Sequence, residues 1–189
     1  MDQSRPVLHV DVRRPQRADA RRNFDALLAA ARDAFAAKGV EASLEDIARQ
    51  AGVGIGTLYR NFPTRQDLLN AVYLGEIEEL CVAAEKVADQ PPWEALTTWL
   101  QQFVRYAATK RAIFESLNRE APAFQAAREA MFAAGRPLFE QAQKSGDARS
   151  DVDFDDVLRM VSGLTAAGYV DDAQRDRVLA IALDGIRAR

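Results

Sequence analysis

The chain has 189 residues, of which 48% are hydrophobic and 28% charged, a composition typical of a soluble globular protein with a real core. Its single cysteine, Cys81, excludes an internal disulfide framework and any multi-cysteine metal site. No uncharged stretch approaches the roughly 18 residues of a membrane span, and the N-terminus lacks the apolar segment of a secretory signal. We therefore expect a cytoplasmic protein without a membrane-spanning segment.

The net charge of −3 argues against a nucleic-acid partner until its distribution is considered. Residues 1–23 carry six arginines and three acids, whereas the chain from Glu76 onward carries 14 bases and 19 acids. The front of the chain is therefore basic and the remainder acidic. Residues 1–16 lack hydrophobic periodicity and are expected to form a flexible basic arm. Charge alone leaves open whether this arm is merely solvated or binds DNA.

The first predicted helix spans residues 17–38 and stops at Gly39, a residue suited to a helix C-terminus. Its apolar residues recur at helical spacing on one face. They are Phe24, Leu27, Leu28, Ala31 and Phe35.

Two short helices are predicted next, residues 44–51 and 55–61, joined by the turn Gly52-Val53-Gly54. Ser43 stands three residues before Asp46, the spacing of a capping box. Three helices in this order, with a glycine in the second turn, predict a helix-turn-helix over about residues 43–62. The third helix of such a motif enters the major groove of DNA.

Projection of the third helix places Leu58 and Phe62 on one side, which we expect to be buried. Gly56, Thr57 and Arg60 point the opposite way, with Tyr59 on the flank. This exposed face is small and rich in hydrogen-bonding groups, so DNA can approach it closely. Without the motif a structural role would be favoured for Tyr59, but its place in the motif favours a functional one.

The rest of the chain also shows helical spacing, and no segment alternates with period two, so we expect an all-α fold of about nine helices. Thr64 and Asp67 have the spacing of a cap for the fourth helix. A kink is expected around Gly135 and Pro137. The later predicted helices are residues 64–87, 93–108, 112–118, 122–144, 154–167 and 173–187.

The run from Ala51 to Leu69 resembles the DNA-binding signature of the TetR family of transcriptional regulators. The Thr-Leu-Tyr triplet, the Phe-Pro pair and the basic residue three positions after that phenylalanine all match in spacing. Close resemblance covers about residues 17–75, and the remainder is similar mainly in length and helix layout. The resemblance implies a helix-turn-helix DNA-binding domain at 17–66 and a larger helical effector-binding and dimerisation domain at 67–189.

The resemblance also implies the DNA contacts. Ser43 and Arg65 would hold phosphates, and Thr57 and Tyr59 would contact phosphate and thymine methyl groups. Arg60 and Asn61 would contact base edges or backbone. Gly54, Ile55 and Gly56 complete the candidate interface, although many family members have a polar or basic pair where this chain has Gly54 and Ile55. Ile55 cannot donate a hydrogen bond, so we expect it to contact a thymine methyl group and to read guanine poorly.

By the same resemblance, the partners are a palindromic double-stranded operator and a second copy of the chain. The homodimer is expected to form through residues 154–167 and 173–187 as a four-helix bundle. Repression released by a ligand is the implied mode of control. The residues expected on the dimer face are Val157, Leu158, Val161, Leu164, Leu179, Leu183 and Ile186.

Aromatic and soft side chains gather in the second half of the chain, where they suit either a plain core or an effector pocket. The resemblance implies a pocket, and its lining predicts a small apolar or amphipathic effector. Arg105 and Glu115 are candidates to select a polar head group. The candidate pocket residues are Trp99, Phe103, Tyr106, Phe114, Phe124, Met131 and Phe132.

No other chemistry is indicated, and we expect neither an enzyme nor a bound metal or cofactor. His9 is the only histidine, so a histidine-based catalytic triad has no support. The acidic run from Asp151 to Asp156 lacks the glycine and glutamate of a calcium loop, and helix capping accounts for it. Cys81 suits a core position, and a role as a thiol sensor stays an open alternative. The remaining alternative is a helical module that binds protein instead of DNA. A salt-dependent mobility shift of DNA would distinguish DNA binding from this alternative.

Overall fold

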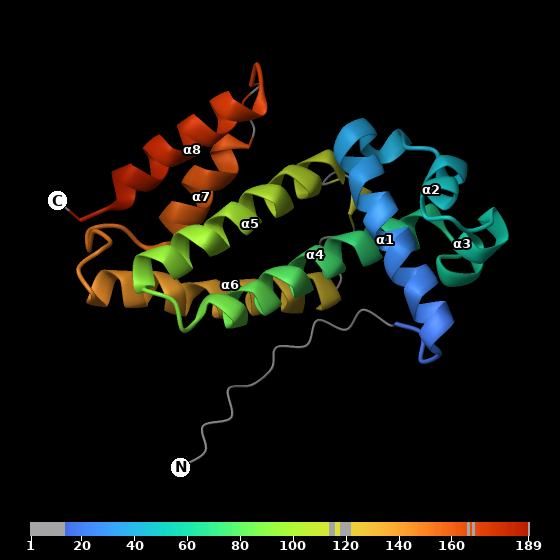
Figure 1. The fold of residues 1–189 in the computed structure, drawn as a ribbon, viewed down its shortest axis with the longest axis horizontal. Helices are drawn as coiled ribbons and strands as arrows, with labels where there is room; N and C mark the ends of the chain where they lie inside the picture. Colours follow the sequence, from blue (N-terminus) through green and yellow to red (C-terminus); the bar gives the residue numbers. More distant parts are fainter. Residues whose placement is uncertain (1–13, 114–115, 118–121, 166, 168, 189) are drawn as a thin grey trace, which may run out of the picture. The chain divides into compact units, whose positions relative to one another are not determined.

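The computed structural model describes residues 14–113, 116–117, 122–165, 167 and 169–188 (Figure 1). Within them the regular structure is helical, apart from an isolated bridge between Ala148 and Arg187. The all-α fold class is thus confirmed. The elements are α1 (Ala18–Lys38), the 3-10 helix η1 (Gly39–Glu41), α2 (Leu44–Gln50), α3 (Ile55–Asn61), α4 (Arg65–Val87), α5 (Pro92–Ile113), α6 (Pro122–Lys144), α7 (Phe154–Leu164) and α8 (Asp172–Ile186).

The described residues contain eight α-helices instead of about nine, because one expected break is absent. α5 continues through residues 109–111, where the sequence predicted a gap between helices 93–108 and 112–118. No proline or glycine interrupts this stretch, and Thr109 and Ile113 are both buried, so the buried stripe continues along the helix. Residues 114, 115 and 118 of the expected helix lie outside the described part. α7 ends at Leu164, three residues earlier than predicted.

Helix α6 continues as one helix through Gly135 and Pro137, and the kink expected there stays a prediction.

The predicted helix caps are confirmed. Thr64 and Asp67 cap α4 reciprocally, the backbone N–H of each donating to the side chain of the other at 2.9 and 3.1 Å. Asp153 and Asp156 form the same kind of capping box at the start of α7.

Two compact units make up the described chain. The N-terminal unit contains residues 14–78 and 109–127, and the C-terminal unit contains residues 79–108 and 128–188, in each case with the gaps given above. Helices α4, α5 and α6 each contribute to both units. The domain boundary after residue 66 stays a prediction.

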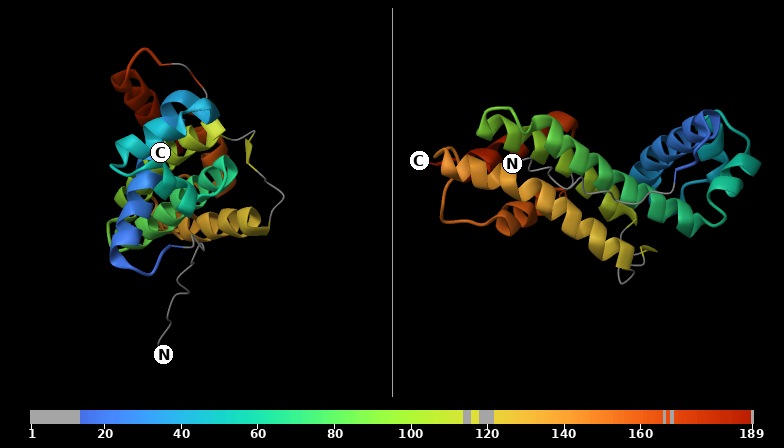
Figure 2. Two further views of the ribbon diagram at one scale, coloured as in Figure 1. Left: turned by 90° about the vertical axis from the view of Figure 1, so that its right-hand side faces the viewer. Right: turned by 90° about the horizontal axis from the view of Figure 1, so that it is seen from below.

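The core of the N-terminal unit forms on the apolar face of α1, where all five predicted stripe residues are buried. The ring of Phe24 lies 4.9 Å, between centroids, from that of Phe62 just after α3. Figure 2 shows α1, α2 and α3 grouped beside the first part of α4. The hydrophobic α4 residues buried in this unit recur at helical spacing and are Leu68, Leu69, Val72, Tyr73 and Ile77.

Ion pairs join α1 to α4 within the N-terminal unit. Arg14, just before α1, lies 3.1 Å from Asp25 and 2.6 Å from Glu78. Burial would lower the pKa of Arg14, but hydrogen bonds and the charges of Glu78 and Asp25 raise it above its ordinary value. Arg32 pairs with the buried Glu76. Because a buried carboxylate is costly without such a partner, this pair fixes α1 against α4.

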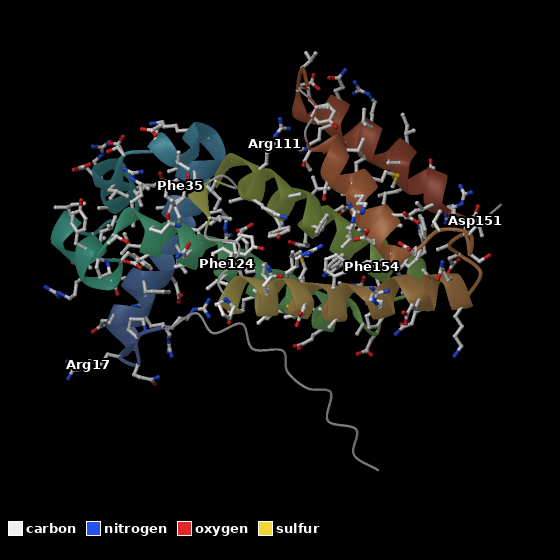
Figure 3. All side chains as sticks on the ribbon, turned by 180° about the vertical axis from the view of Figure 1, so that it is seen from behind. Arg17, Phe35, Arg111, Phe124, Asp151 and Phe154 are labelled. Atoms are coloured by element: carbon white, nitrogen blue, oxygen red, sulfur yellow. The ribbon has the colours of Figure 1, made fainter. Side chains whose placement is uncertain are left out.

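Trp99 lies at the centre of the core of the C-terminal unit. Its buried indole Nε1 donates a hydrogen bond to the Leu80 carbonyl at 3.0 Å. The ring packs against Phe103 and Phe154, with centroids 5.7 and 5.8 Å away. Phe154 points from α7 toward α6 (Figure 3). α6 approaches Trp99 at Gly135, where an added Cβ would lie 2.4 Å from Cη2 of Trp99. Only glycine permits this approach.

The end of the chain closes the loop between α6 and α7. The backbone N–H of Arg149 donates to the Ile186 carbonyl, and that of Ala188 donates to the Asp147 carbonyl, both at 2.9 Å. The Arg149 guanidinium also donates to both oxygens of Asp151, at 2.6 and 2.5 Å. These hydrogen bonds lower the pKa of Asp151 to about 2.

Candidate DNA-binding interface

The second helix of the motif begins as the sequence predicted. The Ser43 hydroxyl oxygen accepts the backbone N–H of Asp46 at 3.2 Å and so caps α2. The same hydroxyl lies 3.2 Å from a carboxylate oxygen of Glu45, to which it donates. A phosphate at Ser43 would therefore have to replace Glu45 as the acceptor.

The turn between α2 and α3 is a Schellman motif built on Gly52, whose φ is +70°. The N–H of Gly52 donates to the Arg49 carbonyl at 3.1 Å, and the N–H of Val53 donates to the Ala48 carbonyl at 3.0 Å. Residues with a Cβ rarely adopt this φ. The turn thereby fixes the direction in which α3 leaves α2.

One side of α3 is buried and the other is open, as the helical projection predicted. Leu58 is fully buried and Phe62 is 3% exposed. Tyr59 is 47% exposed, and Arg60 and Gly56 are also exposed. At Gly54 and Gly56 an added Cβ would meet no atom within 4 Å, so the surface in front of them is clear. Another molecule can therefore contact the backbone of α3 directly.

Three candidate residues are partly engaged within the fold. Ile55 and Thr57 are half-buried. The Asn61 side-chain amide donates to the Thr57 carbonyl at 2.8 Å, which stabilises the end of α3. The remaining amide oxygen of Asn61 is an acceptor, so any base contact through it would be with a donor group.

Arg65 has a structural role that the sequence did not indicate. Its Nη1 donates to the carbonyls of Val40 and Ala42, at 2.6 and 2.7 Å. Arg65 is half-buried and joins the segment after α1 to the first turn of α4. Because these partners precede Arg65 by 25 and 23 residues, no local pattern could reveal the contact.

Charged side chains around α2 are of both signs. Asp46 pairs with Arg49 at 2.5 Å and lies 3.9 Å from Lys38. Arg60 is the cation of α3, and its side chain is exposed. The positive charge offered by α3 itself therefore comes from Arg60.

The candidate effector residues do not form one cluster. Trp99, Phe103, Tyr106 and Met131 are buried in the C-terminal unit, where Phe132 is half-buried. Their rings contact one another or Phe154 at centroid distances of 5.5 to 5.9 Å. Phe124 belongs to the N-terminal unit instead, and its ring stacks on Tyr73 at 4.7 Å. Phe114 and Glu115 lie outside the described residues.

The side chains expected on the dimer face are mostly part of the core of the subunit itself. Six of the seven are buried, and Leu164 is half-buried. The expectation that these six side chains form the dimer face is therefore wrong. The apolar stripe of each helix packs within its own chain, and the six residues are Val157, Leu158, Val161, Leu179, Leu183 and Ile186.

Two family models match the chain. One is described as bacterial regulatory proteins of the tetR family and matches residues 27–72. The other is described as the C-terminal domain of SbtR-like transcriptional regulators and matches residues 91–188.

Solved structures and a curated relative agree with these matches. A TetR transcriptional regulator from Streptomyces coelicolor is 37% identical, with a TM-score of 0.75 over 87% of this chain and 98% of that one. A TetR transcription regulatory protein from Mycobacterium vanbaalenii is 34% identical. Its TM-score is 0.70, and the match covers 92% of this chain and 100% of that one. An HTH-type transcriptional regulator from Staphylococcus aureus (strain MRSA252) is 29% identical over 109 residues. That match spans 56% of this chain and 56% of the curated relative, just over half of its length.

A helix-turn-helix with an open third helix, followed by a helical C-terminal unit, defines a DNA-binding transcriptional regulator. The chain belongs to the TetR family. Regulators of this family bind operator DNA as dimers. None of the helices in the described residues is long and apolar enough to cross a membrane.

Proposed function

We propose that this protein represses transcription by binding a palindromic operator as a homodimer, and that a small apolar or amphipathic effector releases it. The observation that carries the proposal is the open side of α3, where Tyr59 and Arg60 are exposed and the surface in front of Gly54 and Gly56 is clear. Such a protein would act on the chromosome, in the cytoplasm, and would have no catalytic role.

Within this interface, Arg60 is the side chain best placed to read base edges, because it is exposed on the open face. Tyr59 and Thr57 would contact phosphate and thymine methyl groups, and Ile55 would contact a methyl group. Ser43 and Arg65 would hold phosphates at the two ends of the motif, and Asn61 would accept a hydrogen bond. Both end residues already have partners in the fold, so we expect their contacts to position the protein without carrying sequence information.

The homodimer would form through residues 154–167 and 173–187, on the side of α7 and α8 opposite their buried stripes. Ile181 on α8 is 71% exposed and lies two positions from each of the buried Leu179 and Leu183. At Gly163 and Gly185 an added Cβ would meet nothing within 4 Å. Gly185 lies one turn from Ile181 on α8, and a small residue beside an exposed isoleucine allows another helix to approach closely, which supports this face as the interface.

Release by an effector would act through α4. This helix begins in the N-terminal unit and ends in the C-terminal unit without a break, so a displacement in one unit can be transmitted to the other. Two half-sites about one turn of DNA apart require a fixed separation of the two α3 helices. A ligand that favours a different separation would lower operator affinity by binding one state better than the other. The predicted pocket among the aromatic residues of α5 and α6 stays part of this proposal.

The test begins with in vitro selection of bound DNA from a random pool, followed by binding measurements at several salt concentrations. We expect a palindromic consensus and a linear fall of log K with log salt concentration. Arg60→Ala should reduce the preference for the consensus, whereas Lys144→Ala, an exposed cation of the C-terminal unit, should leave it unchanged. A pool that shows no enrichment would contradict the proposal and favour a helical module that binds protein.

A further inference from the structure

The face of α1 that packs against the end of α3 continues as arginine near the start of α1. Phe24 lies on this face, and its ring packs on that of Phe62, directly after α3. Arg21 precedes Phe24 by three positions and Arg17 precedes it by seven, so both fall within about 60° of Phe24 around the helix axis. The backbone N–H of Arg21 donates to the Arg17 carbonyl at 2.9 Å, which holds Arg17 beside the first turn.

Both arginines lie where this face of α1 is no longer covered. Phe24 is the first buried residue of α1, whereas Arg17 and Arg21 are exposed. With a rise of about 1.5 Å per residue, Arg17 lies roughly 10 Å beyond Phe24 along the helix axis. Figure 3 shows Arg17 at the opposite end of α1 from Phe35. The two guanidinium groups therefore lie on the side of α1 that faces α3, beyond the point where α3 ends.

The two acids in this part of α1 already have partners. Asp19 pairs with Arg22, and Asp25 lies 3.1 Å from Arg14. The side chains of the two exposed arginines, in contrast, have no hydrogen-bond or ion-pair partner among the residues that the structure describes. Two such guanidinium groups, one helical turn apart on one face, suit a surface that carries a row of anions.

α3 and these arginines can contact one DNA duplex at the same time. The open glycines lie at the start of α3, and the first residues of a recognition helix are those that contact base edges. The end of α3 then lies toward the edge of the major groove, which is about 12 Å wide. The strand at that edge carries one phosphate for about every 3.4 Å of the duplex axis. Side chains that extend past the end of α3 therefore meet the phosphate backbone.

We propose that Arg17 and Arg21 bind the phosphate backbone of the DNA that flanks each half-site, outside the groove that α3 enters. This inference rests on the proposed function, because it extends the same interface. Phosphate contacts carry no sequence information, so the flanking DNA would add affinity without having a specified sequence. Tight binding would then require duplex beyond both ends of the selected consensus.

Two duplexes that carry the operator selected in vitro test this contact. One ends at the consensus, and the other continues on each side for about six base pairs, roughly half a turn of DNA. At constant salt concentration, the wild-type protein should bind the longer duplex at least about tenfold more tightly, the effect of one charge-assisted hydrogen bond. Flanks of random sequence should serve equally well. Equal affinity for the two duplexes would overturn the inference.

Variants then assign the contact to these residues. The double variant Arg17→Gln and Arg21→Gln should lose the preference for the longer duplex and bind the shorter one as the wild type does. Lys86→Gln with Lys144→Gln removes the same charge at two exposed residues of the C-terminal unit and should retain the preference. All four residues are exposed, so melting temperatures should stay close to that of the wild type. An arginine variant that keeps the preference would show that other residues contact the flanks.

Uncharged methylphosphonates in place of the flanking phosphates separate backbone contacts from contacts to base edges. The wild-type protein should bind this modified duplex no better than the short one, and the arginine variant should not distinguish modified from unmodified flanks. Wild-type affinity that is unaffected by the modification would overturn the phosphate contact. The selection itself tests the proposed function. A pool without an enriched sequence would overturn that function and this inference together, whereas an operator bound equally with and without flanks would overturn this inference alone.

Discussion

Arg60 and Arg65 belong to the same motif, yet their surroundings differ. Arg60 is exposed on α3, so its guanidinium can turn toward DNA without disturbing the fold. Arg65 is half-buried, and its Nη1 holds the carbonyls of Val40 and Ala42. A match to a binding motif therefore does not show whether a residue is free to contact DNA or also stabilises the fold of the motif.

We expect Arg65→Ala to lower the free energy of unfolding by about 1–3 kcal/mol, because two carbonyls lose a charged donor. Arg60→Ala should change it by less than about 0.5 kcal/mol, as is usual for an exposed residue. Urea unfolding of the two variants, side by side, measures this difference. If Arg65→Ala unfolds at the wild-type urea concentration, the two hydrogen bonds contribute nothing to stability.

The same pair of variants tests the phosphate contact. Removing one phosphate contact lowers the slope of log K against log salt by about 1, so Arg65→Ala should show this change on every DNA sequence. Arg60→Ala should instead reduce the difference between consensus and random DNA. A wild-type slope for Arg65→Ala would leave Arg65 with its structural role alone.

The Arg149–Asp151 pair predicts a specific pH dependence. Hydrogen bonds from Arg149 lower the pKa of Asp151 from 3.8 to about 2. Because the folded-state pKa is depressed, the pair stabilises the fold above pH 3.8, and this contribution is lost as the pH falls through about 2. The difference in melting temperature between wild type and Asp151→Asn should be constant from neutral pH to about 4 and should shrink below that. A melting-temperature difference that stays the same below pH 4 would contradict a stabilising role of the Arg149–Asp151 pair.

At the scale of helices, the sequence located most elements because hydrophobic spacing and capping residues act locally. The stripe from Phe24 to Phe35 and the cap at Ser43 are both found as expected. The break predicted at residues 109–111 is absent, because this stretch contains no helix-breaking residue and the buried face continues from Thr109 to Ile113. Which face of α5 meets which neighbour depends on packing between distant segments, and spacing alone does not encode that.

Gly135 shows such a packing constraint. We expect Gly135→Ala to destabilise the protein by about 1–3 kcal/mol, because its Cβ would lie 2.4 Å from Cη2 of Trp99 and 2.7 Å from Cζ of Phe154. Gly75→Ala in α4 is the matched control, since its Cβ would meet Leu28 at an ordinary 3.8 Å. The control should be stabilising by up to about 1 kcal/mol through helix propensity. Denaturant unfolding that ranks the two variants in the opposite order would show that α6 can move away from Trp99.

For the whole molecule, the sequence indicated the class of protein correctly. The prediction of what the apolar residues of α7 and α8 pack against was wrong. The predicted stripe was assigned to a partner subunit, whereas Val157, Leu179 and Leu183 complete the core of their own chain. A hydrophobic stripe reveals that a face is buried, but not by what. Ile181, which is not part of the predicted stripe, is 71% exposed on α8.

We therefore expect Ile181→Glu to yield a folded monomer with weakened operator binding, because a charge placed between two closely packed helices is costly while the subunit core is untouched. Val82→Glu, at a 41% exposed apolar residue of α4, is the matched control and should stay dimeric. Leu183→Glu should instead unfold the protein, since Leu183 is 8% exposed and belongs to the core. Sedimentation velocity and circular dichroism distinguish these results. A dimeric Ile181→Glu variant with wild-type operator affinity would place the interface on another face of the molecule.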